Sequence, residues 1–308
     1  MLEKTSNDQP LVSVIMTFFN RKEFLPEAVE SILNQTYKNI EFIIVDDGSS
    51  DGGYEMLKSY AEKDKRIILL KNNKNRGIVY SANRGIDAAK GKYIARMDSD
   101  DIAHPDRIKK TILYLKENNL DLCGASTELF QSETNEKIKT FHNPQKHEEI
   151  KAALFFGSPV VNPTAIGKAE IFKKLKYTDG FPSAQDYELW SRAIDLYTFG
   201  NTNEVLLRYR VHEDKESGSR KGRQDKNAQR VQKYMFSKIN IDLSKYPNLY
   251  KPKDRILHPV SYFKLLVELF YKNHKIKYVK NKTLFCVIAK EHKEIVKSFA
   301  IKILKKVK

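Results

Sequence analysis

The chain has 308 residues, of which 41% are hydrophobic and 31% are charged, so it can bury a sizeable core and is too apolar to remain unfolded. Its formal net charge of +16 gathers at one end, because residues 251–308 hold 16 lysines and arginines against 4 acidic residues. A nucleic-acid binder needs basic residues around a cleft. This distribution argues against nucleic acid and favours attachment of the basic end to an anionic surface.

Cysteine usage and hydropathy indicate the compartment. Cys123 and Cys286 lie far apart and lack metal-ligand spacing, which favours a reducing environment. The polar segment Met1–Pro10 has no apolar signal core, and no window approaches the roughly 18 apolar residues that cross a bilayer. We therefore expect a cytoplasmic protein associated peripherally with the inner face of the membrane.

The first 120 residues alternate apolar runs with amphipathic segments. Runs rich in β-branched residues predict strands buried on both faces, and apolar residues at three- and four-residue spacing predict helices between them. The predicted strands are residues 11–16, 40–45, 66–70 and 93–97, and the predicted helices are residues 24–35, 54–62 and 82–89, with another helix beginning near His104-Pro105. This order predicts a doubly wound α/β fold with a mostly parallel sheet.

The pattern changes after residue 120. Residues 129–141 are polar and alternating, which predicts an antiparallel hairpin and not another βα repeat. The other expected elements are a strand at 120–124, a loop at 157–163 that runs along the surface or rims a site, a helix at 185–194, a strand at 204–209, and two basic amphipathic helices at about 260–271 and 284–307.

An acidic cluster ends the fourth predicted strand. Asp98, Asp100 and Asp101 fall within four residues, and the second predicted strand likewise ends in Asp46 and Asp47. Open α/β sheets bind ligands at the carboxyl ends of their strands, where a divalent cation carrying phosphates would neutralise such carboxylates. The alternative is a solvated acidic turn that caps the next helix.

Five separated motifs resemble the family-2 (GT2) inverting glycosyltransferases of the GT-A fold, especially the bacterial enzymes that build surface glycans. The resemblance covers roughly residues 10–215. Its motifs are Val14–Asn20 before a helix ending in Asn34-Gln35-Thr36, Val45–Ser49, Asn75-Arg76-Gly77 with Asn83 and Gly85, Met97–Asp101, and Asp186 with Glu188-Leu189-Trp190.

The resemblance implies a Rossmann-like GT-A domain, with a mostly parallel central sheet and flanking helices, over residues 1–250. Its nucleotide-sugar half would span about residues 10–125 and its acceptor half about 126–250. Residues 251–308 would form a basic, helical C-terminal extension.

The resemblance also implies a metal and donor site. Asp98 and Asp100, with Ser99 between them, match the positions that hold the metal ion and the donor, and His212 matches a further metal ligand. Oxygen ligands favour Mn²⁺ or Mg²⁺ over zinc. The role of Asp101 stays open between a third ligand and a cap of the following turn.

Other matched residues concern the nucleotide. Asp47 matches the residue that accepts a hydrogen bond from the uracil imide, which implies a UDP-sugar, and Thr17 and Phe19 match residues that frame the base. Arg76 would meet the base or the phosphates, or would be an ordinary surface arginine. Arg210 matches an arginine that approaches the diphosphate.

Asp186 is the candidate catalytic base. Inversion needs a carboxylate on the acceptor side to take the hydroxyl proton, and the family places its base at the start of a helix, where Asp186 falls. The alternative is an ordinary helix N-cap.

Together these residues predict a metal-assisted glycosyltransferase that moves a hexose or N-acetylhexosamine from a UDP-sugar to a glycan hydroxyl, in capsule, lipooligosaccharide or lipid-linked oligosaccharide. The alternatives are a non-catalytic sugar-nucleotide-binding or scaffold protein and a sugar nucleotidyltransferase. The basic extension would bind an anionic membrane surface, or it would pack on the catalytic domain with its lysines in solvent.

Overall fold

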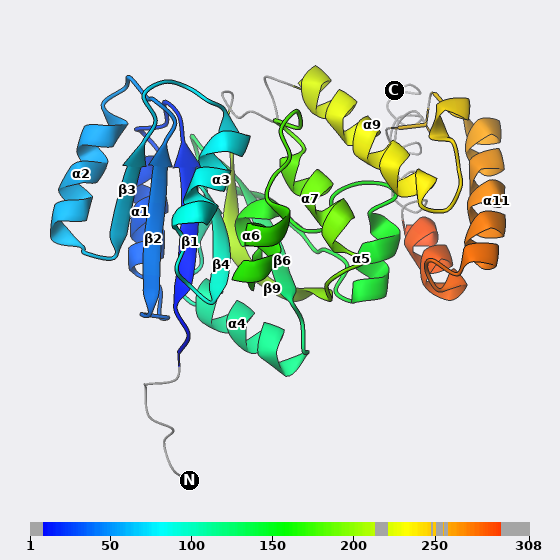
Figure 1. The fold of residues 1–308 in the computed structure, drawn as a ribbon, viewed down its shortest axis with the longest axis horizontal. Coiled ribbons are helices and arrows are strands. Elements are labelled where there is room, and N and C mark those ends of the chain that lie inside the picture. The colour runs from blue at the N-terminus through cyan, green and yellow to red at the C-terminus, as the bar shows by residue number, and fades with distance from the viewer. Residues whose placement is uncertain (1–8, 213–220, 248, 251–254, 256–257, 291–308) are drawn as a thin grey trace, which may run out of the picture.

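The computed structural model describes residues 9–212, 221–247, 249–250, 255 and 258–290. A nine-stranded sheet runs through the molecule in the order β3-β2-β1-β4-β8-β6-β9-β5, with β7 paired to β6. Helices cover both faces of the sheet, and α2 and α11 lie at opposite ends of the molecule (Figure 1).

The N-terminal half is the predicted βα alternation. Strands β1, β2, β3 and β4 are parallel to one another, and helices α1, α2 and α3 connect them. The bounds are β1 Val12–Phe18, α1 Leu25–Leu33, β2 Ile40–Asp46, α2 Gly53–Lys63, β3 Ile67–Lys71, α3 Ile78–Ala88 and β4 Tyr93–Asp98. The sequence thus predicted each of these elements and their order.

Successive side chains of β1 supply two separate cores, as the period of two along a strand requires. Ile15 packs on the side that carries α3, whereas Val14 and Met16 pack on the side that carries α1 and α4. Gly85 of α3 lies so close to β1 that a Cβ atom there would be 2.6 Å from Cγ2 of Ile15. The helix can approach the sheet this closely only because residue 85 has no side chain.

The second half of the sheet is mixed. Strand β8 is antiparallel to both β4 and β6, β6 is parallel to β9, and β5 is antiparallel to β9. The bounds are β5 Ile102–Ala103, α4 Arg107–Glu117, β6 Leu122–Gln131, β7 Lys137–Phe141, α5 His147–Ala153, η1 Asn162–Thr164, β8 Ile166–Lys168, α6 Ala169–Leu175, α7 Gln185–Ala193 and β9 Phe199–Val211.

The predicted hairpin is confirmed, because β6 and β7 pair antiparallel. Strand β6 is longer than expected, since residues 122–131 form one strand that serves both as a sheet strand and as a hairpin arm. Of the two expectations for residues 157–163, a course along the surface is wrong for most of the segment, and a position at the rim of a site stays a prediction. Val160, Asn162 and Pro163 are buried, because this segment passes between the sheet and α7.

The C-terminal part packs on the second half. Its elements are α9 Lys221–Ser237, which the sequence did not predict, η2 Leu243–Lys245, α11 Pro259–Ile276, and a helical segment at residues 281–290. Leu265 and Leu269 of α11 join the same buried cluster as Phe155 and Phe236. Packing of the extension on the rest of the chain is therefore confirmed for its described part. The predicted continuation of the last helix beyond residue 290 lies outside the described residues.

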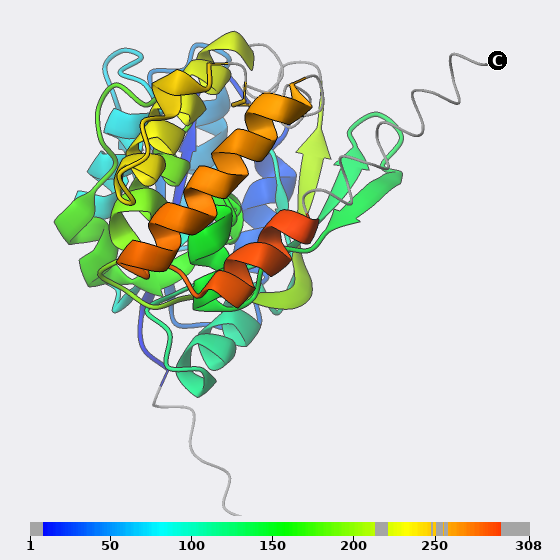
Figure 2. The same cartoon turned by 90° about the vertical axis from the view of Figure 1, so that its right-hand side faces the viewer.

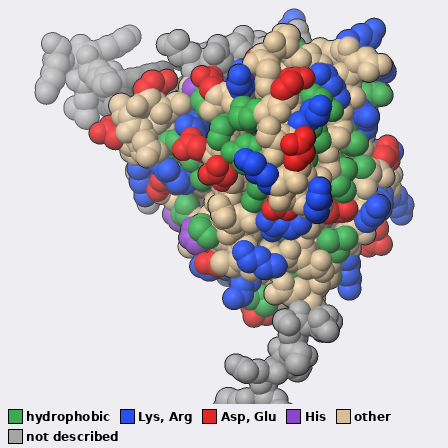
Figure 3. Space-filling view, turned by 90° about the vertical axis from the view of Figure 1, so that its left-hand side faces the viewer, with side chains coloured by type: hydrophobic (Ala, Val, Ile, Leu, Met, Phe, Trp, Pro, Cys, Tyr) green, Lys and Arg blue, Asp and Glu red, His purple; other side chains and the backbone are tan. Residues whose placement is uncertain are grey.

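Among the helices that the structure describes, none combines the length and the apolar character that a bilayer-spanning helix requires. Figure 3 shows the end of the molecule that carries α2, where basic and acidic side chains are intermingled. The positive charge of the chain is therefore not concentrated on this face.

Candidate functional site

The two acidic strand ends lie at one edge of the sheet. Thr17 of β1 pairs with Val45 of β2 on one side and with Asp98 of β4 on the other. Asp47 and Asp98 therefore flank the end of β1, as expected for parallel strands. Phe19, just beyond that end, is 39% exposed. An aromatic ring is thus available beside both carboxylates.

Asp47 fixes the segment that leads into α3. Its Oδ1 accepts hydrogen bonds from Asn72 Nδ2 at 2.8 Å and from the backbone N–H of Arg76 at 2.9 Å, and its Oδ2 accepts one from the N–H of Gly77 at 2.8 Å. A carboxylate at the start of a helix also interacts favourably with the helix dipole. Each carboxylate oxygen has two acceptor positions, so this role is compatible with a further bond from a nucleobase N–H.

The Arg76 side chain is exposed, and its guanidinium lies 4.1 Å from the centroid of the Tyr80 ring. It borders a hollow of about 440 Å³ whose charged lining residues are all basic: Lys71, Lys74, Arg76 and Arg84. The turn at Gly48 adjoins the same loop, because a Cβ atom at Gly48 would meet Lys74 C at 2.6 Å and its φ is +79°. The surface beside Asp47, at this edge of the sheet, is therefore positively charged.

The end of β9 returns to the acidic turn after β4. His212 Nε2 lies 3.0 Å from Asp100 Oδ2, and Arg210 Nε donates to the carbonyl of Asp100 at 2.8 Å. The backbone N–H of Arg210 donates to Asp101 Oδ1 at 3.0 Å. Asp101 thus binds the β9 backbone, a structural contact that the sequence did not predict. Ser99 and Asp100 are buried in the turn.

Arg210 makes several contacts inside the protein. Its guanidinium pairs with Glu27 of α1 and lies 4.7 Å from the centroid of the Phe130 ring, and the residue is only 5% exposed. The His212 ring packs against Phe24 with centroids 4.5 Å apart. These contacts give Arg210 a structural role at the turn, and its contact with a diphosphate stays a prediction.

Sequence reasoning missed two buried arginines near the acidic turn. The Arg107 guanidinium donates to the carbonyls of Arg96 at 3.0 Å and Pro163 at 2.7 Å. Burial lowers the pKa of Arg107 to about 10, and the charges of Asp101 and Asp98 oppose that change. Arg96 is 1% exposed and donates to the carbonyl of Ile15 at 3.0 Å. For Arg96 the sequence did carry a signal of a special role, because it is an arginine within an apolar strand just before the carboxylates.

The side chains that could act as ligands can be compared with those that the predicted metal ion requires. Asp100 and His212 meet, and Asp98 is the last residue of β4, two residues before Asp100, but no three His, Cys, Asp or Glu side chains converge as a metal cluster within the described ranges. Mg²⁺ and ions like it often take only one or two carboxylates from the protein and the rest of their ligands from substrate phosphates and water. The residues therefore fit an ion that is completed by a diphosphate.

Asp186 lies in the first turn of α7, where the N-cap residue is Ala184. The N-cap alternative is therefore not adopted. Ser158 Oγ donates to Asp186 Oδ2 at 3.4 Å. Burial raises the pKa of Asp186 above its ordinary value, although the backbone N–H groups of Tyr187 and Asp186 and the Ser158 hydroxyl act in the opposite direction.

Tyr177 brings the two halves of the site together. Its hydroxyl donates to Asn162 Oδ1 at 3.0 Å. Burial raises the pKa of Tyr177 to about 12, Arg96 opposes the increase, and the charges of Asp186 and Asp98 add to it. One buried hydroxyl therefore interacts with the predicted base from the second half and with the predicted donor-side carboxylate from the first.

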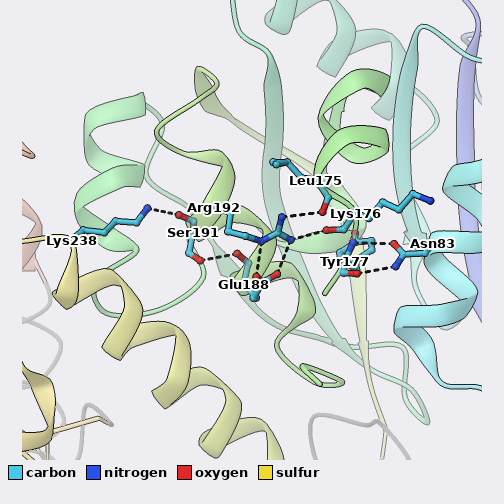
Figure 4. Close-up of polar contacts among 8 residues, drawn as sticks. All are labelled: Asn83, Leu175, Lys176, Tyr177, Glu188, Ser191, Arg192 and Lys238. Carbon is cyan, nitrogen blue, oxygen red and sulfur yellow. Dashed lines mark hydrogen bonds and ion pairs between the residues drawn. The ribbon is translucent and has the colours of Figure 1, made fainter. Parts of the chain in front are cut away.

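A chain of polar contacts holds α7 in place (Figure 4). Arg192 of α7 pairs with Glu188 through Nε at 2.6 Å and Nη2 at 2.8 Å. Its guanidinium also donates to the carbonyls of Leu175 at 3.0 Å and Lys176 at 2.7 Å. The next residue, Tyr177, exchanges two backbone hydrogen bonds with the Asn83 side chain of α3. The helix that carries Asp186 is thereby tied to the nucleotide half.

Comparison with known proteins identifies the family. The model of the family described as "Glycosyl transferase family 2" matches residues 13–176. The chain belongs to glycosyl transferase family 2. A glycosyltransferase of Haemophilus influenzae is 35% identical over 76% of this chain and 77% of its own length. The O-antigen biosynthesis glycosyltransferase WbnJ of Escherichia coli is 33% identical over 66% of this chain and 80% of its own length.

Two solved structures share the fold. TarS 1–349 of S. aureus, in complex with UDP-GlcNAc, superposes with a TM-score of 0.60 at 16% identity, covering 94% of this chain and 92% of that one. The mannosyltransferase PcManGT of Pyrobaculum calidifontis, in complex with GDP-Man and Mn²⁺, gives 0.61 at 15% identity, covering 92% and 88%. The expected GT-A fold is confirmed, and the protein is a glycosyltransferase.

Arg192→Met should lower the free energy of unfolding by about 2 kcal/mol, because it breaks a half-buried ion pair and two carbonyl contacts. It should also reduce glycosyl transfer at temperatures where the variant is fully folded, since α7 loses its connection to α3. The matched control is Arg66→Met, which removes a similar pair with Asp64 and a contact with the Leu33 carbonyl, far from the site. Equal transfer rates in the two folded variants would contradict the positioning role.

Asp186→Asn should raise the free energy of unfolding at neutral pH. The folded pKa of Asp186 is raised above the ordinary value of 3.8, so the folded protein binds this proton more tightly and loses stability as pH rises through that window. The gain from the substitution should therefore be larger at about pH 7.5 than at about pH 4, as measured by urea unfolding. Asp179→Asn, at an exposed position, is the control. A variant that is less stable at neutral pH would instead indicate a stabilising role at the start of α7.

Proposed function

We propose that the protein is an inverting glycosyltransferase that moves a hexose or N-acetylhexosamine from a UDP-sugar to a hydroxyl of a glycan acceptor. The observation that carries the proposal is the set of contacts that ties α7, with Asp186 in its first turn, through Arg192 and the segment at Tyr177 to Asn83 of α3. A donor held at the end of β4 and an acceptor deprotonated from α7 would then meet between the two halves. A sugar-nucleotide-binding scaffold would not need a half-buried carboxylate, with its pKa raised by burial, on the acceptor side.

The donor side supports a nucleoside diphosphate sugar. Asp98, Asp100 and His212 would hold Mn²⁺ or Mg²⁺, and a bound divalent ion neutralises the charge that develops on the leaving diphosphate. The relative PcManGT was solved with GDP-Man and Mn²⁺, and TarS with UDP-GlcNAc. Asp47 favours uracil, since its carboxylate can accept the imide N–H while it also holds Gly77.

Asp186 would act as the general base. As the acceptor oxygen bonds to the anomeric carbon, the hydroxyl proton passes to an Asp186 oxygen, and the bond from the anomeric carbon to the diphosphate oxygen breaks on the opposite face of the sugar. A general base works best when its pKa lies near the working pH. The increase that burial causes in the Asp186 pKa is in that direction.

The acceptor is proposed to be a bacterial surface glycan or its lipid-linked precursor. The match to an O-antigen glycosyltransferase supports a polysaccharide acceptor. The excess of lysine and arginine in residues 251–308 supports peripheral attachment at the cytoplasmic face of a membrane, where lipid-linked acceptors are displayed.

Asp186→Asn should reduce the transfer rate by about 10²–10⁴-fold, because the acceptor hydroxyl loses its base. Binding of UDP-sugar, followed by calorimetry, should be unchanged. Transfer is measured as UDP release across a panel of UDP-sugars with lipid-linked acceptors, and Asp179→Asn should retain the full rate. Full activity in Asp186→Asn would exclude this residue as the base.

Asp100→Asn and His212→Ala should each weaken Mn²⁺ binding in the presence of UDP by about 10–100-fold, since each removes one predicted ligand. Electron paramagnetic resonance of free Mn²⁺ measures this directly, and Glu117→Gln, at an exposed position on α4, is the control. Transfer by the native protein that persists in EDTA would contradict the metal site.

A further inference from the structure

Helix α11 has apolar side chains on two opposite faces. Tyr262, Leu265 and Leu269 point inward and are at most 3% exposed. On the opposite side lie four large apolar residues at steps of three, four and four, with exposed fractions of 68%, 67%, 53% and 56%: Val260, Phe263, Val267 and Tyr271. Scattered exposed hydrophobic residues are normal, but a stripe at helical spacing marks a contact surface.

The next helical segment extends this stripe. Phe285, in residues 281–290, is 63% exposed, and its ring centroid lies 6.4 Å from that of Phe270 on α11. Figure 2 shows α11 and this segment running across the outer face of the molecule, at the end away from α2. We call Val260, Phe263, Val267, Tyr271 and Phe285 the outer face.

Lysines border the outer face. Lys264 and Lys275 lie on α11 along one side of the stripe, and Lys275 Nζ is 4.6 Å from the centroid of the Tyr271 ring. The acidic residue of α11, Glu268, accepts a hydrogen bond from the Tyr246 hydroxyl at 2.8 Å. The side chains beside the stripe therefore present mainly positive charge.

This charge distinguishes between possible occupants. Two copies that met through the outer face would bring their lysines close together, which is unfavourable. A bilayer with anionic headgroups pairs with the lysines and accepts the apolar side chains below them, as an amphipathic helix in the membrane interface requires.

We propose that the outer face of α11, together with Phe285, inserts into the interface of an anionic phospholipid bilayer. This proposal rests on the proposed function, because it supplies the surface at which a lipid-linked acceptor would be met. The inward side chains of α11 are also buried in the hydrophobic core that contains residues of α5 and α9. The bilayer would therefore contact a helix whose inward face is buried against the rest of the protein.

The test uses the full-length protein and vesicles of phosphatidylglycerol and phosphatidylcholine in co-sedimentation. Phe263→Ser/Val267→Ser/Tyr271→Ser should weaken binding to anionic vesicles by at least about tenfold, because it removes most of the inserted apolar area. Lys264→Gln/Lys275→Gln should weaken it by about thirtyfold at low salt and remove the preference for phosphatidylglycerol. The matched control, Leu113→Ser/Leu196→Ser, replaces exposed leucines at 47% and 60% exposure outside this face and should bind as the native protein does.

UDP release from donor with a soluble acceptor, measured without vesicles, should be the same in all of these variants. That readout separates failure of the membrane surface from failure of the proposed function. Vesicle binding that is unchanged in the apolar triple variant would overturn the proposal. So would a native dimer in sedimentation velocity that the same variant dissociates, because the face would then bind a second copy.

Discussion

The site depends on buried positive charge next to its carboxylates. Asp98 and Asp101 lie in one short turn beside Arg107, which is fully buried and donates to backbone carbonyls from two other segments. An unpaired buried charge is costly, and a guanidinium with opposite charges nearby reduces that cost. With a pKa of about 10, Arg107 stays charged at neutral pH. The turn can therefore carry several acidic side chains before any ligand binds.

The same turn is where the end of β9 joins the nucleotide half. Arg210 and His212 both bind Asp100, and the Arg210 backbone binds Asp101, so residues more than a hundred positions apart form one unit. On the other side of the sheet, Arg192 and Asn83 hold the segment around Tyr177 between α7 and α3. These two sets of contacts orient the second half of the sheet and α7, with Asp186, relative to the carboxyl ends of β1, β2 and β4.

Helix α11 of the C-terminal extension has two faces with different surroundings. The inner residues of α11 are buried with Phe155 and Phe236 of the catalytic domain. Its outer residues remain exposed beside lysines. The two alternatives for this segment, packing and membrane contact, therefore involve different faces of the same helix and do not exclude one another.

Local sequence determined the elements of the nucleotide half and the positions of its acidic strand ends. Period-two burial and three-to-four spacing depend on near neighbours in the chain, and parallel strands must end at one edge, so Asp47 and Asp98 could be placed together from sequence. The antiparallel hairpin of β6 and β7 followed from its alternation in the same way.

Only the tertiary structure decided the contacts that depend on distant pairing. No local pattern brings His212 to Asp100, assigns Asp101 to the β9 backbone, or places Arg107 beside the acidic turn, since each contact depends on how the two halves of the sheet join. The same holds for α7. Whether Asp186 is an N-cap or a half-buried carboxylate with a raised pKa depends on how the surrounding segments pack, which local sequence does not determine.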